Sequence, residues 1–473
     1  MSIIVWFRQD LRLADNPALA AAAASGKPVV PLYILDPDMM PGGASRWWLH
    51  GSLDALARDL RALGAPLVLR RGSARDVLHE LAREAGASGV FWNRCYEPDA
   101  IARDRAIEKS LASQGLDAAS FKGALLREPW EISTAAGMPY KVFTPFWRAL
   151  AAQAPFGAPL PAPGSLRAVP GLATDDPASW RLRPSRPDWA AAFGDVWLPG
   201  ERAARLRLAA FLDGSVRDYG EARNMPAREA TSRLSPHLHW GEISPRQIWF
   251  AAQARAGEQP ALAAGVESFL RELGWREFSH YLICHWPHMV DRAWKPAYGN
   301  FPWRRDESAF RLWTKGLTGY PIVDAGMREL WRTGYMHNRV RMISASFLVK
   351  DLLIDWREGA AWFEDTLVDA DLACNRAGWQ WVAGSGADAA PFFRIFNPVL
   401  QGEKFDADGA YLRRHLPELA RLDTRFIHRP WEAPPAALDA AGIVPGKTYP
   451  LPIVDHAAAR ARALAALAKV QRR

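Results

Sequence analysis

The stretch from Gly334 to Trp381 carries the strongest indications of the fold and of a ligand site in this chain. Three of its runs stand out: "GYMHNRVRM" from residue 334, "DADLACN" from residue 369 and "GWQW" from residue 378. In the first run, Asn338, Arg341 and Met342 recur at helical spacing, so they share one face of a helix. An amide, a guanidinium and a thioether together are unusual both for a core and for a solvated face. With the carboxylates and tryptophans of the other two runs, they predict a wall of a cofactor pocket. The alternative is a buried polar network between helices.

Length and composition bound the class of protein. A chain of 473 residues exceeds what one compact core holds, so two or three domains are expected. The hydrophobic fraction of 49% and the charged fraction of 23% are typical of a soluble globular protein. The start, "MSIIVWFRQD", lacks the order of a signal peptide, and no apolar run reaches membrane-spanning length. We therefore expect a cytoplasmic protein with no membrane partner.

Cysteine and histidine usage argues against a metal site. The three cysteines (Cys95, Cys284 and Cys374) form no CxxC pair, which excludes a disulfide framework or a four-cysteine site. The run "CHWPH" from Cys284 adds two histidines, but no further ligand follows at useful spacing, so no metal is expected. His337 is expected to be a hydrogen-bonded structural histidine.

Charge and tryptophan content point to a polyanionic partner and to aromatic chemistry. The net charge is +8, of which residues 1–200 contribute +2 and the remainder +6. A basic excess in the second half favours a polyanion as partner there. The 22 tryptophans are concentrated beyond residue 179. Most are expected to pack in the core, but indole rings also form stacking platforms and electron relays.

The first half of the chain alternates strand and helix signals. Short apolar runs at residues 2–7, 29–35, 66–70 and 89–93 are separated by helical patterns. Before the first of these helices, Asn16 can cap and Pro17 can occupy the first turn. This alternation predicts a parallel sheet with helices on both faces, an α/β domain of Rossmann-like architecture over residues 1–130. No GxGxxG run follows a strand, so the usual dinucleotide fingerprint is absent.

The residue pattern changes twice in the rest of the chain. Nine prolines between residues 155 and 199 describe an extended connector, assigned to residues 131–200. From residue 201 to 473, apolar residues recur at helical spacing and strand signals vanish. We therefore predict an all-α domain there, in which the segment 337–356 is helical. The basic last segment is expected to form a helix that docks or frays.

The motifs "VWFRQDLRLADNPAL" from residue 5 and "TSRLSPHLHWGEIS" from residue 231, together with the runs after Gly334, resemble the DNA photolyase/cryptochrome family. They follow one another in the family's order over nearly the whole chain. The resemblance implies an α/β antenna domain, a connector and a helical domain that holds FAD. Within the family, the details resemble class I cyclobutane pyrimidine dimer photolyases. The implied activity is a carbon–carbon lyase: light-dependent repair of UV-damaged DNA by electron transfer from photoexcited reduced FAD.

The family pattern implies the residues around FAD: Tyr219, Thr231, Ser232, Arg233, Leu234, Ser235, Phe269, Arg276, Asn338, Arg341, Asp369, Asp371 and Asn375. Hydroxyls and backbone amides in the run from Thr231 suit a diphosphate. Arg341 is expected to pair with Asp369 beside the isoalloxazine. Asn375 is expected to face flavin N5, where relatives that act as plant photoreceptors typically carry aspartate. This asparagine therefore favours repair over signalling.

The resemblance also implies a lesion pocket and an electron relay. The pocket comprises Glu272, Trp275, Asn338, Met342 and Trp381. The relay comprises Trp303, Trp356 and Trp379. Repair enzymes for (6-4) lesions carry histidines where Asn338 and Met342 stand, so these two residues favour the cyclobutane dimer. Trp275 and Trp381 offer flat apolar walls that suit a lesion taken out of the base stack.

Contacts to DNA are expected from Arg223, Glu272, Trp275, Asn338, Arg339, Gln401 and Lys404. Contacts between the basic residues and phosphates predict that affinity for DNA depends on salt and not on sequence. The protein is expected to act as a monomer.

Several alternatives stay open. The antenna chromophore is expected to be methenyltetrahydrofolate, although Ala100 replaces the acidic residue of the folate-binding relatives. An 8-hydroxydeazaflavin, FMN or another second flavin, or no antenna at all, are the alternatives. The rival function is a cryptochrome-like blue-light photoreceptor, which a long C-terminal extension would favour. A light-independent FAD oxidoreductase would require a substrate base and an NAD(P) site, and neither is evident.

Overall fold

A computed structural model describes residues 1–388 and 393–471. The chain forms two compact units, each assembled from three segments. The first unit holds Met1–Arg217, Ser232–Pro287 and Val368–Asp371. The second holds Asp218–Thr231, His288–Leu367 and Leu372–Arg473. The functional boundaries at residues 130 and 200 stay predictions.

The first unit is built on a five-stranded parallel sheet in the order β3-β2-β1-β4-β5. The strands are β1 (Ser2–Phe7), β2 (Val29–Leu35), β3 (Val68–Arg71), β4 (Ala87–Asn93) and β5 (Asp117–Phe121). The predicted parallel sheet is confirmed, but the sequence patterns missed β5. Of its residues "DAASF", only Phe121 favours strands, and none is fully buried, since β5 is an edge strand that needs little apolar surface.

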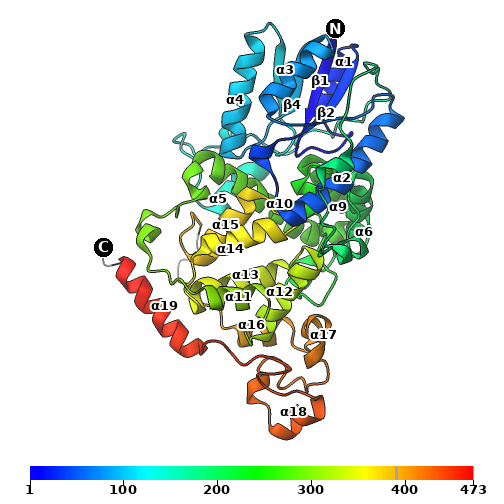
Figure 1. Ribbon diagram of the computed structural model, residues 1–473. Coiled ribbons are helices and arrows are strands. Elements are labelled where there is room, and N and C mark those ends of the chain that lie inside the picture. Colours follow the sequence, from blue (N-terminus) through cyan, green and yellow to red (C-terminus); the bar gives the residue numbers. More distant parts are fainter. Residues whose placement is uncertain (389–392, 472–473) are drawn as a thin grey trace. The chain divides into compact units, whose positions relative to one another are not determined.

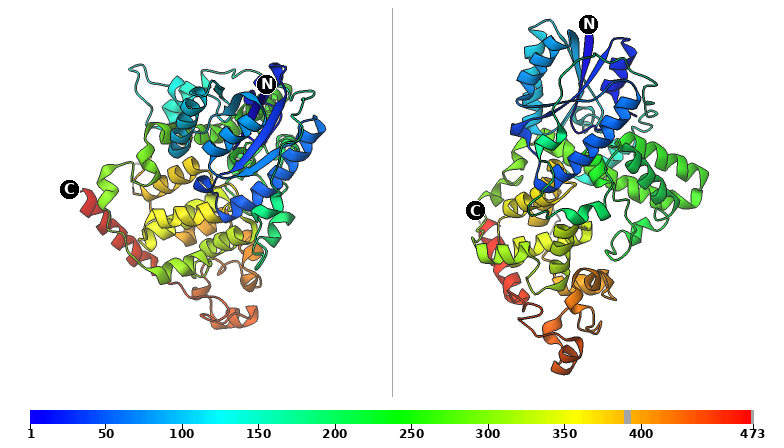
Figure 2. Two further views of the ribbon diagram at one scale, coloured as in Figure 1. Left: turned by 45° about the horizontal axis from the view of Figure 1, so that its top comes forward. Right: turned by 45° about the vertical axis from the view of Figure 1, so that its right-hand side comes forward.

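Both faces of this sheet are apolar because helices cover both of them. Ile4 and Trp6 of β1 join the core cluster formed with α3 (Ala74–Glu84) and α4 (Pro98–Ala112). The helix α1 (Pro17–Ala24) packs on β1 and β4. In Figures 1 and 2, α3 and α4 lie on one side of the strands and α1 on the other. As predicted, the Asn16 side chain caps α1 by accepting a hydrogen bond from the Leu19 amide at 3.1 Å.

Helices complete the first unit. They are α2 (Gly43–Ala62), α5 (Phe143–Ala151), α6 (Glu201–Asp213), α8 (Ser235–His239), α9 (Pro245–Glu258) and α10 (Ala263–His285). The long α10 packs against α5 and α9, and its buried face carries a continuous apolar stripe. This packing fixes α10 as a platform for the polar residues on its other faces.

The second unit is helical in its described residues, where only two isolated bridges occur and no strand. Its helices are α7 (Tyr219–Ala222), α11 (Glu307–Thr314), α12 (Pro321–Thr333), α13 (Asn338–Ser346), α14 (Trp356–Thr366), α15 (Leu372–Ala383), α16 (Pro398–Phe405), α17 (Ala410–His415), α18 (Pro435–Ala441) and α19 (His456–Gln471). The predicted all-α class is confirmed. None of the helices in the described segments combines the length and apolarity that crossing a membrane requires.

The helical spacing predicted over residues 337–356 is interrupted. The helix α13 gives way to a π-helical turn at Phe347–Asp351, and Leu353 adopts a left-handed φ of 56°. The Asp355 side chain then caps α14 by accepting a hydrogen bond from the Arg357 amide at 3.0 Å. A capping residue has a non-helical backbone, so one helix cannot run through this point.

The basic C-terminal helix docks within the second unit. His456 Nδ1 lies 2.6 Å from Asp351 Oδ1 at the start of α19. Further along the helix, Ala463 and Ala466 are buried against Phe301 and its neighbours. One polar and one apolar contact therefore hold this helix. Of the two predicted alternatives, docking and fraying, the structure shows docking.

Candidate functional site

The turn before α8 is shaped to bind an anion. Arg233 has a left-handed φ of 51°, a conformation rare outside glycine, and Leu234 follows in the right-handed helical region. Successive residues of opposite hand turn their backbone N–H groups toward one concavity, which favours phosphate oxygens. Next in the chain, Ser235 Oγ donates a 2.6 Å hydrogen bond to Asp369 Oδ2. This run is therefore a candidate site for an anionic group such as a phosphate.

The second carboxylate of the "DAD" run is held in a charged environment of the first unit. Asp371 Oδ2 lies 3.0 Å from His280 Nε2, and both side chains are buried. Burial alone would raise the pKa of Asp371, but His280, Arg276 and His239 lower it well below its usual value. The Asp371 carboxylate therefore stays ionised and suits hydroxyl or N–H donors of a ligand.

The helix α10 presents four of the predicted residues: Phe269, Glu272, Trp275 and Arg276. Phe269 is buried against Phe211, with ring centroids 4.6 Å apart. Trp275 is half-buried and stacks on Phe143 with centroids 3.7 Å apart and planes 9° apart. Stacking on one side leaves the indole as a rigid flat surface, which suits a flipped base.

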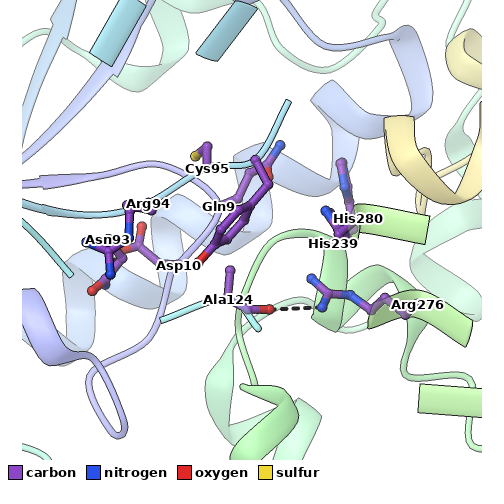
Figure 3. A pocket seen from close by; sticks show the side chains of 10 residues that line it. Gln9, Asp10, Asn93, Arg94, Cys95, Ala124, His239, Arg276 and His280 are labelled. Atoms are coloured by element: carbon purple, nitrogen blue, oxygen red, sulfur yellow. Dashed lines mark hydrogen bonds between the residues drawn. The ribbon is translucent and has the colours of Figure 1, made fainter. Parts of the chain in front are cut away.

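An enclosed cavity lies at the carboxyl ends of β1 and β4, where the strand order reverses. Ligands of open parallel sheets bind at such a switch point. Its volume is about 10 Å³, and it is lined by Gln9, Asp10, Asn93, Arg94, Cys95, Tyr96, Ala124, His239, Arg276 and His280. Figure 3 shows Arg276 turned toward the Ala124 carbonyl, to which Nη1 donates a 2.9 Å hydrogen bond. Burial raises the pKa of the Cys95 thiol to about 12, so the sulfur is protonated and unreactive.

Glu277 is a buried carboxyl next to Arg276 of this cavity. No sequence motif pointed to it. Oε2 accepts the Leu126 amide at 2.8 Å, and Oε1 lies 3.6 Å from Arg276 Nη1. Burial raises the pKa of Glu277 to about 7, although Arg276 and the Leu126 amide oppose the shift. The carboxyl is therefore half-protonated near neutral pH.

We expect Glu277 to make folding stability depend on pH. An acid with a raised pKa favours folding at low pH, and its contribution is lost as pH rises from 4.5 through about 7. Glu277→Gln should remove this dependence, with a gain at pH 8 relative to pH 4.5 of at most about 3 kcal/mol. Urea denaturation from pH 4.5 to 8 measures it. The matched control is Glu267→Gln, at an exposed position of the same helix. Parallel pH profiles of the two variants would contradict the assignment.

In the second unit, α13 carries the mixed face predicted from the sequence. Asn338 begins the helix and is exposed, and its Nδ2 lies 4.0 Å from Met342 Sδ one turn later. Arg341 Nε donates a 2.6 Å hydrogen bond to the Met336 carbonyl, and its guanidinium lies 5.0 Å from the Tyr335 ring centroid. The amide and thioether thus form one contiguous surface. The Arg341–Asp369 pair stays a prediction.

The helices α14 and α15 hold the predicted asparagine and relay tryptophans. Asn375 Nδ2 donates a 3.0 Å hydrogen bond to the Ala360 carbonyl, which orients the amide. Trp379 is buried against Phe363, and a Cβ on Gly359 would come within 2.1 Å of its ring, so only glycine fits there. Trp356 is buried at the first position of α14. The third relay residue, Trp303, and the lesion-pocket residue Trp381 are both partly buried.

Arginines gather around His337. Burial, with the charges of Arg341, Arg339 and Arg223, lowers the pKa of His337 to about 4, so the ring is neutral and structural. Arg339 Nη2 donates a 2.5 Å hydrogen bond to Asn224 Oδ1, and its guanidinium lies 4.4 Å from the Phe405 ring centroid. The predicted DNA contacts Gln401 and Lys404 lie on the same helix as Phe405, α16. The predicted cofactor residue Tyr219 lies beside Arg223, whose guanidinium is 5.5 Å from the ring centroid.

Sequence patterns missed His239 and His280, which line the cavity. His239 lies in the quoted "SPHLHW" run, and His280 lies on α10 one turn beyond Arg276. His280 contacts Asp371, which is distant in sequence, so spacing gave no signal for it. His285 of the "CHWPH" run lies with Nε2 3.2 Å from the Pro129 carbonyl, a structural contact.

Comparison with known proteins identifies the family. The family model described as DNA photolyase matches residues 3–164, and the FAD binding domain of DNA photolyase matches residues 269–469. The deoxyribodipyrimidine photo-lyase of Agrobacterium fabrum is 53% identical over 99% of this chain and 98% of its own length. Cryptochrome-1 of Arabidopsis thaliana is 41% identical over 99% of this chain and 70% of its own length.

A solved structure supports the same relationship. The crystal structure of a bacterial class III photolyase from Agrobacterium tumefaciens superposes with a TM-score of 0.97 at 53% identity. The superposition covers 100% of this chain and 98% of that chain. That relative is named class III, so it does not support the class I expectation. The α/β sheet unit, the match to the FAD binding domain and the 53% identity over the full length all indicate the same family. The chain belongs to the DNA photolyase/cryptochrome family.

Proposed function

We propose that this protein repairs cyclobutane pyrimidine dimers in DNA, using blue light and a bound FAD. The observation that carries the proposal is the rigid Trp275 surface on α10, stacked on Phe143 one turn from Glu272. A flat, half-buried indole next to a carboxyl offers stacking and a hydrogen bond to the same extruded base. The Asn338–Met342 surface on α13 adds an amide and an apolar contact of the kind a thymine dimer requires. The relatives named photolyases support the assignment.

The residues present fit the cofactor. The backbone N–H groups of the concave turn at Arg233 and Leu234 would donate to the diphosphate. The Asp369 and Asp371 carboxylates would accept hydrogen bonds from hydroxyl and N–H groups elsewhere on the cofactor. When bound, reduced FAD supplies the photoexcited electron donor that the protein lacks. In the second unit, hydrogen bonding orients the neutral amide of Asn375. By the family pattern, Asn375 and Arg341 would face the flavin, where a positive charge favours an anionic ring system. In its protonated form, Glu272 would donate a hydrogen bond to a carbonyl of the dimer and so stabilise negative charge arriving there.

The relay and antenna complete the proposal. Trp379 and Trp356 are buried and Trp303 is partly exposed, a gradient that suits electron flow from solvent toward the cofactor. A second chromophore in the α/β unit, with methenyltetrahydrofolate proposed first, would widen the absorbed spectrum. The absorbance of the chromophores released on denaturing purified protein would identify it, because folate, deazaflavin and flavin absorb at different wavelengths. The proposed repair acts on cellular DNA, so a cytoplasmic monomer bound to the nucleoid is the state that fits.

The subclass and the alternative function follow from the comparisons. We infer that the chain is close to the class III photolyases, because the solved relative so named is 53% identical. The second candidate is a blue-light photoreceptor, favoured by the 41% identity to a plant cryptochrome. Asn375 favours repair, since a neutral amide offers no proton to a flavin nitrogen.

The deciding experiment is illumination of the reduced holoprotein with an oligonucleotide that contains one thymine dimer. We expect dimers to disappear under blue light and to persist in the dark. Persistence of the dimer under blue light, with the flavin verified as fully reduced, would contradict the repair function and favour the photoreceptor.

We expect Arg339 to contribute to nonspecific DNA affinity through a phosphate contact. Arg339→Gln should weaken binding to damaged and undamaged duplexes equally and reduce the salt slope of log affinity by about 1. Fluorescence anisotropy at several salt concentrations measures both. The control is Arg425→Gln, because Arg425 is exposed and paired with Asp423 in the same unit. An unchanged slope for Arg339→Gln would exclude the contact.

A further inference from the structure

We propose that His280 is a positioning residue for the cofactor site: its Nε2 holds the Asp371 carboxylate, and its Nδ1 binds an ordered water in the cavity behind it. The inference rests on the proposed FAD site, because Asp371 would face that cofactor. It concerns a side chain that the family pattern in the sequence did not single out.

The geometry places His280 between Asp371 and the cavity. Nε2 lies 3.0 Å from Asp371 Oδ2, a hydrogen-bonding distance, and this contact helps to lower the pKa of Asp371. The ring lines the cavity together with His239 and Arg276, as Figure 3 shows. The same side chain thus contacts the Asp371 carboxylate and lines the enclosed space.

The cavity contains buried ring nitrogens that a water molecule could bind. His280 Nδ1 and His239 Nδ1 are buried, and within residues 1–388 and 393–471 neither has a hydrogen-bond partner. Buried polar atoms of this kind are normally satisfied by protein or by ordered water. A volume of about 10 Å³ matches the space that the centre of one water molecule needs. A water there would fix the ring plane of His280 and thereby the direction of Nε2.

Arg276 and His239 also lie near Asp371 and lower the pKa of its carboxyl. Arg276 already donates to the Ala124 carbonyl and lies near Glu277. His239 is buried, and burial lowers its pKa, which favours the neutral ring. His280, whose Nε2 lies 3.0 Å from Asp371 Oδ2, is therefore well placed to hold the carboxylate in position.

Two substitutions separate the two edges of the ring. His280→Gln places an amide nitrogen where Nε2 stands, whereas His280→Asn places one near Nδ1 and withdraws from Asp371. The probe is FAD itself, titrated into each apoprotein and followed by quenching of flavin fluorescence. We expect His280→Asn to raise the dissociation constant on the order of 10- to 150-fold, the effect of one lost charge-assisted hydrogen bond. His280→Gln should stay within about threefold, well below the tenfold that 1.4 kcal/mol represents.

A double-mutant cycle tests whether His280 acts through Asp371. In an Asp371→Asn background, His280→Asn should cost no further FAD affinity, because the partner carboxylate is already gone. Thermal midpoints of the apoproteins report folding, and a merely structural role would lower the midpoint while leaving FAD affinity unchanged. If His280→Asn does not fold, the comparison of His280→Gln with Asp371→Asn decides: retained affinity in the first and loss in the second are expected.

Equal FAD affinity of His280→Asn and the unchanged protein, or additive losses in the cycle, would overturn the inference. Equal loss in the glutamine and asparagine variants would also overturn it, since the Nε2 position would then be irrelevant. Failure of the repair function is distinguishable, because binding is measured without DNA or light. A protein that binds FAD but repairs nothing would contradict the proposed function and leave this inference standing.

Discussion

Replacing Trp356 with phenylalanine should nearly abolish photoreduction of oxidised FAD while repair by the chemically reduced protein stays almost unchanged. Trp356 is buried at the first position of α14, and phenylalanine fills most of the same space. A benzene ring is much harder to oxidise than an indole, so the substitution removes one step of the relay and little else. Absorbance during blue illumination with a thiol reductant measures photoreduction, and dimer loss after dithionite reduction measures repair.

The control for this prediction is Trp431→Phe, a partly buried tryptophan of the same unit that packs on Tyr320. It should leave both rates unchanged. Equal loss of photoreduction and repair in Trp356→Phe would show that the residue acts through the fold. This result would contradict a role in the electron relay.

Removing the Trp275 ring should reduce affinity for the lesion far more than affinity for undamaged DNA. Base stacking on an aromatic side chain contributes about 1–3 kcal/mol, so Trp275→Ala should weaken dimer binding on the order of 5- to 150-fold. The stacked contact with Phe143 is lost in the same change. Trp275→Phe should therefore recover much of the affinity, because it restores a flat ring on the same platform.

Competition between damaged and undamaged oligonucleotides measures the selectivity of each variant. Phe250→Ala, at an exposed position on α9, is the control for loss of an exposed aromatic side chain in the first unit. A uniform loss of affinity for both oligonucleotides in Trp275→Ala would place the ring against the DNA backbone and not against the dimer.

The elements that sequence patterns predicted well are those with local signals. The buried strands β1, β2 and β4 are continuous apolar runs, and Asn16 with Pro17 marks the start of α1. The Asn338–Met342 face follows from helical spacing alone. By contrast, β5 is defined by its pairing with β4, and its own residues carry little strand preference. Nothing local to the segment predicts that pairing.

The parts that could not be predicted depend on partners remote in sequence. The contact between His280 and Asp371 joins residues 91 positions apart, and Glu277 meets the Leu126 amide 151 positions away. Spacing rules describe neighbours on one helix or strand, so they do not detect such pairs. The break after α13 has another origin: apolar residues continue through the π-helical turn at Phe347–Asp351, so periodicity alone does not show where the first helix ends and where Asp355 caps the next.

The order in which the chain is synthesised matters for the first unit. This unit takes only four residues, Val368–Asp371, from the late part of the chain. They include the acceptor of the Ser235 hydroxyl and the partner of His280. A nascent chain that has reached residue 287 already contains the whole sheet and α10, yet both contacts are still missing. The anion-binding turn is therefore expected to become fully ordered only after residue 371 has left the ribosome, and a fragment ending earlier should bind flavin weakly.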